Sequence, residues 1–279
     1  MCRHTRCCPR LIPFAQQARM FQTSWQTYDH YGYAVIAVAG TFAAVAALHW
    51  LVQRSRWASW ARSLNGVAPP FINIIGVLFA LTLAFLGNDT WSAHDRAMRS
   101  VYREAEALRS IAVLSQTLPA LLQERLRAAL VGYASASVDE WQLLARRAES
   151  STVVERADAL LILLASSEIE KTAGANVQAL LLRKISEIRD ERDQRVALSQ
   201  THVNPLKWLG MAFLGLLTLL SIAVVHVDRA RAALVSVILF ALAAAPTAAI
   251  VLVQGNPFQY PTDVTPAPIE AAVAGLHSR

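Results

Sequence analysis

Cysteine is almost absent from this chain of 279 residues. The three cysteines, Cys2, Cys7 and Cys8, all lie at the start, so no disulfide framework holds the rest of the chain together. With His4 they could imitate a metal site, but the paired C-x-x-C spacing and a second nearby histidine are missing. We therefore expect neither structural disulfides nor a bound metal.

The sequence also lacks the motifs that mark common catalytic sites. It contains no G-x-S-x-G nucleophile elbow, no phosphate loop and no H-E-x-x-H motif. Its 7 histidines include no pair spaced like metal ligands on one helix. No set of nucleophile, base and orienting group can be assigned. We expect a protein that is not an enzyme and has no cofactor; the alternative in that class is a membrane hydrolase with scattered catalytic residues.

Charge is scarce as well. Only 16% of the residues are charged and 54% are hydrophobic, whereas soluble domains carry about 25% charge. The net charge of +6 suits anchoring at anionic lipid headgroups. No basic face is interleaved with aromatic residues, so we expect no nucleic-acid partner. The long apolar segments have no Asp or Glu in their middle, which argues against a proton-coupled carrier but leaves a channel open.

Four apolar segments, at 33–52, 71–87, 206–227 and 232–253, are long enough to cross a membrane. A helix needs about 20 apolar residues to do so, and it satisfies its own backbone hydrogen bonds there. The segments form two pairs around a charged stretch of helical periodicity. The sequence therefore predicts an all-α fold: four transmembrane helices in two hairpins, with an intervening helical extramembrane domain.

This layout divides the chain into five parts. We expect an N-terminal tail that is disordered, a first transmembrane hairpin, a helical extramembrane domain, a second transmembrane hairpin and a C-terminal tail, at 1–30, 31–87, 88–205, 206–254 and 255–279. The first 19 residues lack a signal-peptide h-region, so translation from Met1 or from Met20 stays open.

No helix break follows the second apolar segment, and the apolar periodicity continues beyond it until Leu118-Pro119. Further helices are predicted at 120–149, 153–170 and 175–203. The last of these contains the charged run 189–195, which we interpret as a solvated face. Arg189 with Asp193 and Glu191 with Arg195 have the spacing of ion pairs within a helix.

The second segment has two notable features. Small residues recur on one face, which suits helix packing or a pore lining, at Gly76, Ala80, Ala84 and Gly87. Asn73 is its one strongly polar side chain and suits a hydrogen bond between helices or contact with an ion. Beyond the segment, His94-Asp95-Arg96 suits an interfacial salt bridge or a gating or ion-selecting role.

Several short motifs, in a shared order, resemble an uncharacterised bacterial family of membrane proteins described as bestrophin-like. They are G-V-L-F-A-L-T-L-A-F at 76–85 with Trp91 and R-E-A-E-A-L at 103–108; Leu118-Pro119 with L-V-G-Y at 130–133 and D-E-W at 139–141; I-R-D-E-R-D-Q-R at 188–195 with P-L-K-W at 205–208; and N-P-F at 256–258 with Val264 and P-A-P at 266–268. The resemblance extends from Tyr33 to the C-terminus.

The stretch 81–91 with Arg96 also looks like the segment in which a bestrophin helix leaves the membrane. Bestrophins are pentameric anion channels lined by their second membrane helix, so the resemblance implies a homo-oligomer that passes small anions. The chain departs from them at Ala97-Met98-Arg99, where paired aromatic residues are expected. The alternative is a structural or signalling scaffold in the membrane without transport activity.

Under the channel hypothesis we assign three groups of residues. An apolar constriction with one polar mouth comprises Asn73, Ile74, Val77, Leu78 and Leu81; the helix-packing face comprises the four small residues; the electrostatic mouth comprises His94, Asp95, Arg96, Arg99 and Arg103. The arginines would raise the local concentration of anions.

Orientation follows from the positive charges. The hairpin connectors and the tails carry equal numbers of arginines, and the arginines of the central domain near the membrane favour the cytoplasm for that domain. We expect a multi-pass protein of the inner membrane, with the central domain and both termini in the cytoplasm.

Overall fold

The computed structural model describes residues 29–54, 68–201, 204–260 and 263–277. Within these residues the fold is entirely helical, which confirms the predicted fold class. Residues 1–28, including Met20, lie outside the described residues. The expectation of a disordered N-terminal tail and the choice of start codon therefore stay predictions.

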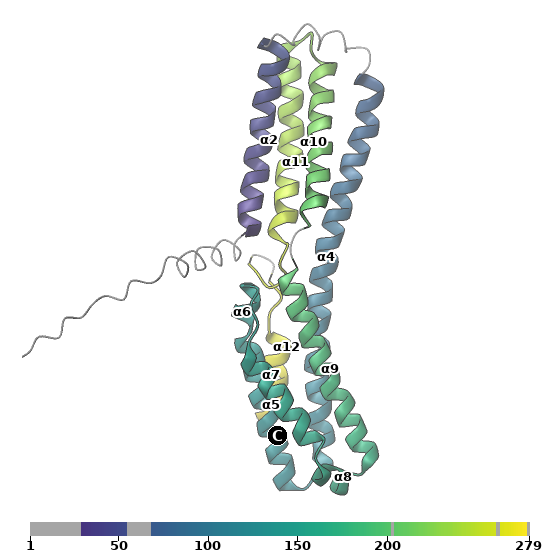
Figure 1. Ribbon diagram of the computed structural model, residues 1–279, viewed down its shortest axis with the longest axis vertical. Coiled ribbons are helices and arrows are strands. Elements are labelled where there is room, and N and C mark those ends of the chain that lie inside the picture. Colours follow the sequence, from purple (N-terminus) through teal and green to yellow (C-terminus); the bar gives the residue numbers. More distant parts are fainter. Residues whose placement is uncertain (1–28, 55–67, 202–203, 261–262, 278–279) are drawn as a thin grey trace, which may run out of the picture.

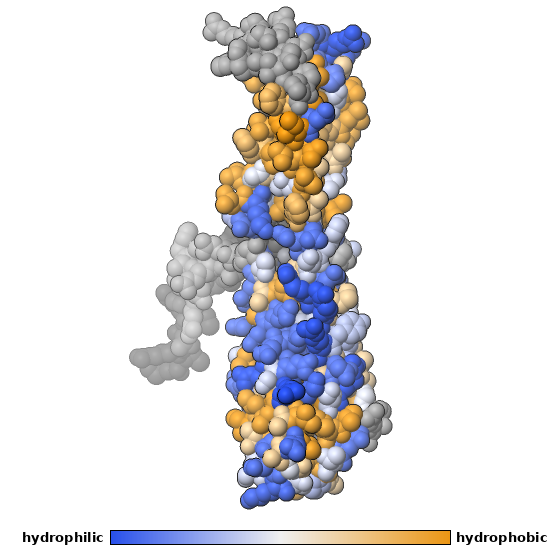
Figure 2. All heavy atoms as spheres, turned by 90° about the vertical axis from the view of Figure 1, so that its right-hand side faces the viewer, coloured by the Kyte–Doolittle hydropathy of each residue, from blue (hydrophilic) through white to orange (hydrophobic). Residues whose placement is uncertain are grey.

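Four helices are long and apolar enough to cross a membrane. They are α2 (Asp29–Arg54), α4 (Ala68–Leu114), α10 (Pro205–Val225) and α11 (Ala230–Val253). Figure 1 shows them side by side at one end of the molecule, where α11 packs on α2 and α10 on α4. The four predicted spans are confirmed. In Figure 2 this end is mainly hydrophobic, while hydrophilic residues dominate below it.

The second span continues without a break, as its periodicity predicts. Helix α4 has 47 residues and is therefore about 70 Å long, more than twice the thickness of the hydrocarbon core. It leaves the spans and becomes a central element of the helical domain (Figure 1). One rigid element thus carries residues from the membrane into the domain.

The helical domain combines the extramembrane part of α4 with shorter helices. They are the 3-10 helix η1 (Ser115–Thr117), α5 (Ala120–Asp139), α6 (Trp141–Ala145), α7 (Ser151–Leu164), α8 (Ser167–Ala173) and α9 (Ala175–Gln200). Their shared core includes the fully buried side chains of Leu108, Leu126, Leu160 and Ile185. The domain therefore has an apolar core of its own.

Two of the predicted helices are interrupted. The helix expected at 120–149 ends as α5, resumes as α6 and stops before Arg147, whose φ of 58° is incompatible with a right-handed helix. The helix expected at 153–170 breaks between α7 and α8. There the side-chain amide of Gln178 donates hydrogen bonds to the carbonyls of Leu164, at the end of α7, and Ser166, just before α8.

The segment expected as a C-terminal tail folds into the helical domain. Its helix α12 (Ala267–His277) packs against α4 and α5. Phe258, Val264 and Ile269 are buried in the same core as the rest of the domain. The hydroxyl of Tyr31, at the start of α2, donates a hydrogen bond to the carbonyl of Tyr260. Both described ends of the chain thus lie on the side of the spans that carries the helical domain.

Candidate pore helix and the charge cluster beside it

The predicted constriction residues lie on the outer face of α4. Ile74 and Leu78 are 59% and 48% exposed, and Val77 and Leu81 are exposed on either side of them. The opposite face carries Phe79, Leu83 and Leu86, which pack with α10 and α11. Within one chain, the face assigned to the pore is therefore free to meet lipid, water or another subunit.

The same face continues beyond the membrane into the arginine-rich part of α4. Leu78 and Arg96 are eighteen residues apart in the sequence, as are Leu81 and Arg99. Eighteen residues make five turns of 3.6 residues, so each arginine lies directly below its leucine at a distance of about 27 Å. The pair Phe85 and Arg103 repeats this relation, and Phe85 is exposed too.

Phe85 is a candidate pore residue that our sequence analysis missed. Its spacing of four and seven residues from Leu81 and Leu78 would have identified it as a member of the same face. Within the motif at 76–85 we considered the recurrence of the small residues and not that of Leu78, Leu81 and Phe85.

The arginines of this face differ in their pairing. Arg103 lies 3.3 Å from Glu191 of α9, whereas Arg96 and Arg99 make no ion pair with any described residue. Asp95 is exposed and His94 half-buried, and neither forms an ion pair in the described part of the chain. The interfacial salt bridge that we considered for His94-Asp95-Arg96 is therefore not formed there. His94 points away from the arginine face by helical geometry.

The small residues divide into two kinds. Gly87 is buried, and a Cβ placed on it would lie 3.7 Å from Val251 of α11. Ala80 and Ala84 are exposed, and a Cβ on Gly76 would meet nothing within 4 Å. Their role in helix packing stays a prediction. Asn73 is exposed as well.

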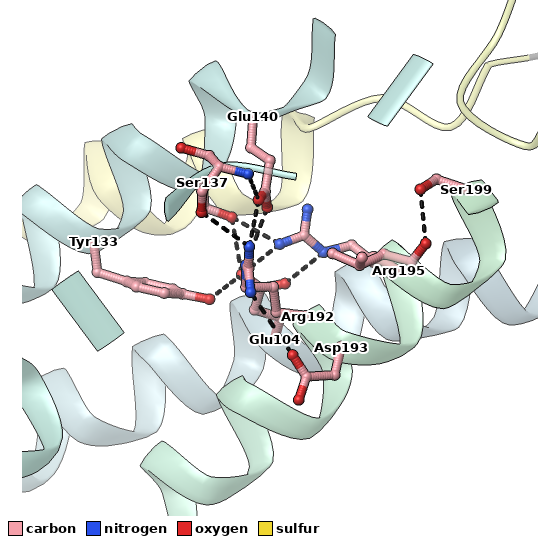
Figure 3. A network of polar contacts seen from close by, with 10 residues as sticks. Glu104, Tyr133, Ser137, Glu140, Arg192, Asp193, Arg195 and Ser199 are labelled. Atoms are coloured by element: carbon pink, nitrogen blue, oxygen red, sulfur yellow. Dashed lines mark hydrogen bonds and ion pairs between the residues drawn. The ribbon is translucent and has the colours of Figure 1, made fainter. Parts of the chain in front are cut away.

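A cluster of buried charges lies beside the extramembrane part of α4 (Figure 3). Glu104 of α4 and Arg195 of α9 are each 0% exposed, and Arg195 Nε lies 2.8 Å from Glu104 Oε2. The other carboxylate oxygen accepts hydrogen bonds from Tyr133 at 2.8 Å, Ser137 at 3.0 Å and Arg195 Nη2 at 3.1 Å. Burial raises the pKa of Tyr133 well above its usual value, and the charge of Glu104 raises it further.

A second ion pair completes the cluster. Arg192 Nη2 lies 2.5 Å from Glu140 Oε1 and 3.2 Å from the Ser150 carbonyl, and Glu140 also accepts from the Ser150 amide at 2.9 Å. Burial lowers the pKa of Arg192, but the hydrogen bond and the charge of Glu140 outweigh this, so the pKa is raised. Arg192 therefore stays charged inside the domain.

The solvated-face interpretation of the run 189–195 is wrong for three of its residues. Glu191, Arg192 and Arg195 are buried, and the predicted pairs within the helix do not form. Arg195 pairs with Glu104, Glu191 with Arg103, and Arg189 with Asp158 on α7. The spacing would have revealed this, because Arg192 and Arg195 continue the apolar stripe of Ile185 and Ile188 at three and four residues.

Trp141 connects this cluster to the C-terminal segment. The guanidinium of Arg195 lies 4.7 Å from the centre of the Trp141 ring, and Trp141 Nε1 donates to the Val264 carbonyl at 2.6 Å. Phe258 packs edge-on against the same ring. Contacts therefore run from the C-terminal segment through α6 and α9 to α4. Because each buried acid is paired with an arginine, the cluster fixes the position of α4 rather than offering a base or a nucleophile.

No group of three or more metal-binding side chains occurs among the residues that the structure describes. We therefore derive no metal-dependent chemistry from this part of the chain.

Comparisons with known proteins place the chain in a family and a fold. A model of the family described as the Bestrophin-like domain matches residues 39–269. A bacterial bestrophin homologue from Klebsiella pneumoniae is similar in structure, with a TM-score of 0.61, 13% identity, and coverage of 88% of this chain and 96% of that chain. A single-residue variant of that homologue is similar with a TM-score of 0.62 and 14% identity, and 93% of this chain and 97% of that chain are covered.

A structure described only as a membrane protein variant gives a TM-score of 0.63 at 14% identity, with 88% of this chain and 96% of that chain covered. At such identities these similarities establish the fold alone. No curated protein sequence matches the chain.

Proposed function

Because this chain belongs to the family defined by the Bestrophin-like domain, we propose that it is an oligomeric membrane channel for small anions, with α4 lining its pore. Its partners are then the lipid bilayer, other copies of the same chain and the permeating anion. The channel lies in the inner membrane, with the helical domain and both termini in the cytoplasm. The proposal includes no catalytic reaction and no cofactor.

One observation carries the proposal: a single straight helix presents apolar side chains and unpaired arginines on one face. Polar side chains are expected on any helix that leaves a membrane, but here the exposed arginines are aligned with the exposed apolar side chains. The alignment of Leu78 with Arg96 and of Leu81 with Arg99 gives a continuous path from a constriction to a positive mouth. By contrast, α11 ends where its apolar part ends.

The two parts of this path have different physical effects. A narrow ring of Ile74, Leu78 and Leu81 side chains can control permeation, because a narrow apolar passage loses its water. Arg96 and Arg99, exposed and without an ion pair in the described chain, attract anions to the cytoplasmic mouth. Asn73 lies at the other mouth, where its amide can donate a hydrogen bond to an anion.

An oligomer is required because one α4 cannot surround a pore. The exposed α4 face of each chain would meet the corresponding faces around a central axis, as in a cyclic assembly. In the helical domain, α4, α5 and α12 border a hollow of about 380 Å³ that is lined by charged and apolar residues, among them Arg109, Val113, Arg127 and Leu276. Such a partly apolar hollow in the helical domain suits contact with a neighbouring copy.

Halide efflux from proteoliposomes tests the proposal. Replacing Ile74 and Leu78 by alanine should raise the efflux by about threefold to tenfold, which corresponds to ~0.7–1.4 kcal/mol off the barrier. The matched control is the double substitution Leu239→Ala and Leu242→Ala on α11, where both leucines are equally exposed but lie on another helix. This control should leave the efflux unchanged.

The charge part of the proposal has its own variant. Arg96→Glu with Arg99→Glu should lower the efflux at low ionic strength, and 1 M salt should shrink the difference because the Debye length falls to about 3 Å. Arg156→Glu with Arg183→Glu, at exposed positions of α7 and α9, controls for the same change of charge. If neither wild type nor variants exceed empty liposomes, the channel proposal fails and the scaffold alternative is favoured. If all move halide equally, permeation is real but these residues do not control it.

A further inference from the structure

A small pocket lies where three spans join the helical domain. It has a volume of about 230 Å³, and its lining includes Asp89 and Thr90 of α4, Asn204 before α10, and Lys207 and Trp208 of α10. Val251, near the end of α11, forms part of its apolar wall. None of these residues belongs to the buried charge cluster or was assigned to the pore, although Asp89 lies between Phe85 and Arg96 along the same face of α4.

The pocket lies at the depth of the lipid headgroups. Asp89 follows the apolar stretch 71–87 of α4 by two residues, α10 begins at Pro205, and α11 ends at Val253. All three helices thus change from apolar to polar at one level, where hydrophobic surface gives way to hydrophilic surface in Figure 2. Trp91, exposed here, donates to Gln254 at 3.1 Å, and tryptophan is typical of a membrane interface.

The pocket presents one positive and one negative group side by side. Lys207 Nζ lies 2.7 Å from Asp89 Oδ2, and the two side chains are 56% and 57% exposed, so a ligand can reach both. Lys207 is also in the first turn of α10, whose capping residue Asn204 accepts from the Leu206 amide at 3.0 Å. The positive end of the helix dipole therefore adds to the charge of Lys207.

This pair complements a headgroup that carries both charges. A phosphate would bind beside Lys207 and the start of α10, and a primary ammonium would donate hydrogen bonds to Asp89. We propose that the pocket binds the phosphoethanolamine headgroup of an aminophospholipid. Pockets for drug-sized ligands usually measure about 300–1,000 Å³, so this smaller one suits a headgroup. Leu86, Trp208 and Val251 extend its apolar wall towards the spans, where the acyl chains continue.

The proposal excludes two other common headgroups on chemical grounds. The quaternary ammonium of phosphocholine has no N–H to donate to Asp89. Phosphoglycerol has no cation at all and would leave the Asp89 carboxylate beside a second negative charge. Preference for a primary amine is therefore the property that distinguishes this site from general attraction of lipid to a positive surface.

Native mass spectrometry of the purified full-length protein tests the site. The protein is titrated with phosphatidylethanolamine, phosphatidylcholine and phosphatidylglycerol of identical acyl chains. We expect the ethanolamine lipid to be retained about fivefold better than the choline lipid, the size expected of a charge-assisted hydrogen bond at a half-exposed site. Soluble phosphoethanolamine and inorganic phosphate serve as competitors; if they displace the lipid fully, the occupant is a soluble phosphate compound.

Two variants separate the two charges. Asp89→Asn should abolish the preference for the amine while phosphate-dependent retention persists, and Lys207→Met should weaken retention of all three lipids. The matched control is Lys184→Met with Glu187→Gln, which removes a pair of the same 2.7 Å length in α9, away from the spans. Exposed pairs contribute little stability, so melting temperatures should agree among all variants.

Equal retention of the ethanolamine and choline lipids by the wild type would overturn the proposal, and so would a preference that persists in Asp89→Asn. The measurement needs no ion flux. Its outcome is therefore independent of whether the protein is a channel.

Discussion

In the spans, α4 leaves Ile74, Leu78 and Phe85 exposed, whereas in the helical domain it buries even a glutamate completely. Both halves belong to one helix, but they meet different surroundings. The domain buries one side of its half and supplies an arginine for Glu104, while Arg96, Arg99 and Tyr102 stay exposed on the other side. The membrane half receives packing from α10 and α11 on one side alone. One chain thus buries one side of α4 completely in the domain and less completely in the membrane.

The two halves of α4 therefore differ in what they contribute to stability and to the proposed function. Buried ion pairs add little net stability compared with apolar packing, but removing one partner is costly because the other charge is left unpaired. The cluster therefore fixes α4 in one position within the domain. The exposed face in the spans contributes little to the stability of one chain, and it is available for lipid or, in the proposed channel, for the pore.

The largest expected effect comes from removing one charge of the buried cluster in the helical domain. Glu104→Ala leaves Arg195 buried without its carboxylate and should lower the free energy of unfolding by about 3–5 kcal/mol. Glu106→Ala, two residues away, removes an exposed pair with Arg109 and should cost less than about 1 kcal/mol. Denaturant unfolding followed by circular dichroism compares the two. Equal losses would show that the cluster is not the tightly coupled element that its burial indicates.

The pH dependence of the free energy of unfolding tests the same cluster, and a smaller effect is expected. Because the pKa of Tyr133 is raised in the folded state, its contribution is fully present below about pH 10 and is lost as the pH rises above that value. The loss is about 1.4 kcal/mol for each pH unit above 10. Tyr133→Phe should remove this alkaline slope, whereas Tyr102→Phe, at an exposed position of α4, should retain it. An unchanged slope in Tyr133→Phe would assign the alkaline loss to other groups.

Much of the fold followed from the sequence because length and apolarity determine membrane spans almost by themselves. The four spans, the unbroken α4 and the stop before Leu118-Pro119 were all predicted correctly. The family resemblance was also confirmed. These features depend on local pattern, which a sequence displays directly.

The pairing within the buried cluster could not be predicted from local pattern, because the partners are far apart in the chain. Arg195 pairs with Glu104 across 91 positions and Arg192 with Glu140 across 52. A charged side chain is exposed by default, and only the apolar stripe of α9 indicated otherwise. The folding of the C-terminal segment onto Trp141 was missed for the same reason.

The central claim, that the exposed α4 face lines a water-filled anion path, is tested most directly by thiol accessibility. Cys2, Cys7 and Cys8 are first replaced by serine, and Leu78→Cys and Leu239→Cys are then compared in proteoliposomes with an anionic, membrane-impermeant thiosulfonate. The two leucines are similarly exposed in one chain, on α4 and on α11. We predict that Leu78→Cys reacts and that its modification blocks halide efflux, while Leu239→Cys stays unmodified in lipid. Leu78→Cys reacting no faster than Leu239→Cys would contradict the account.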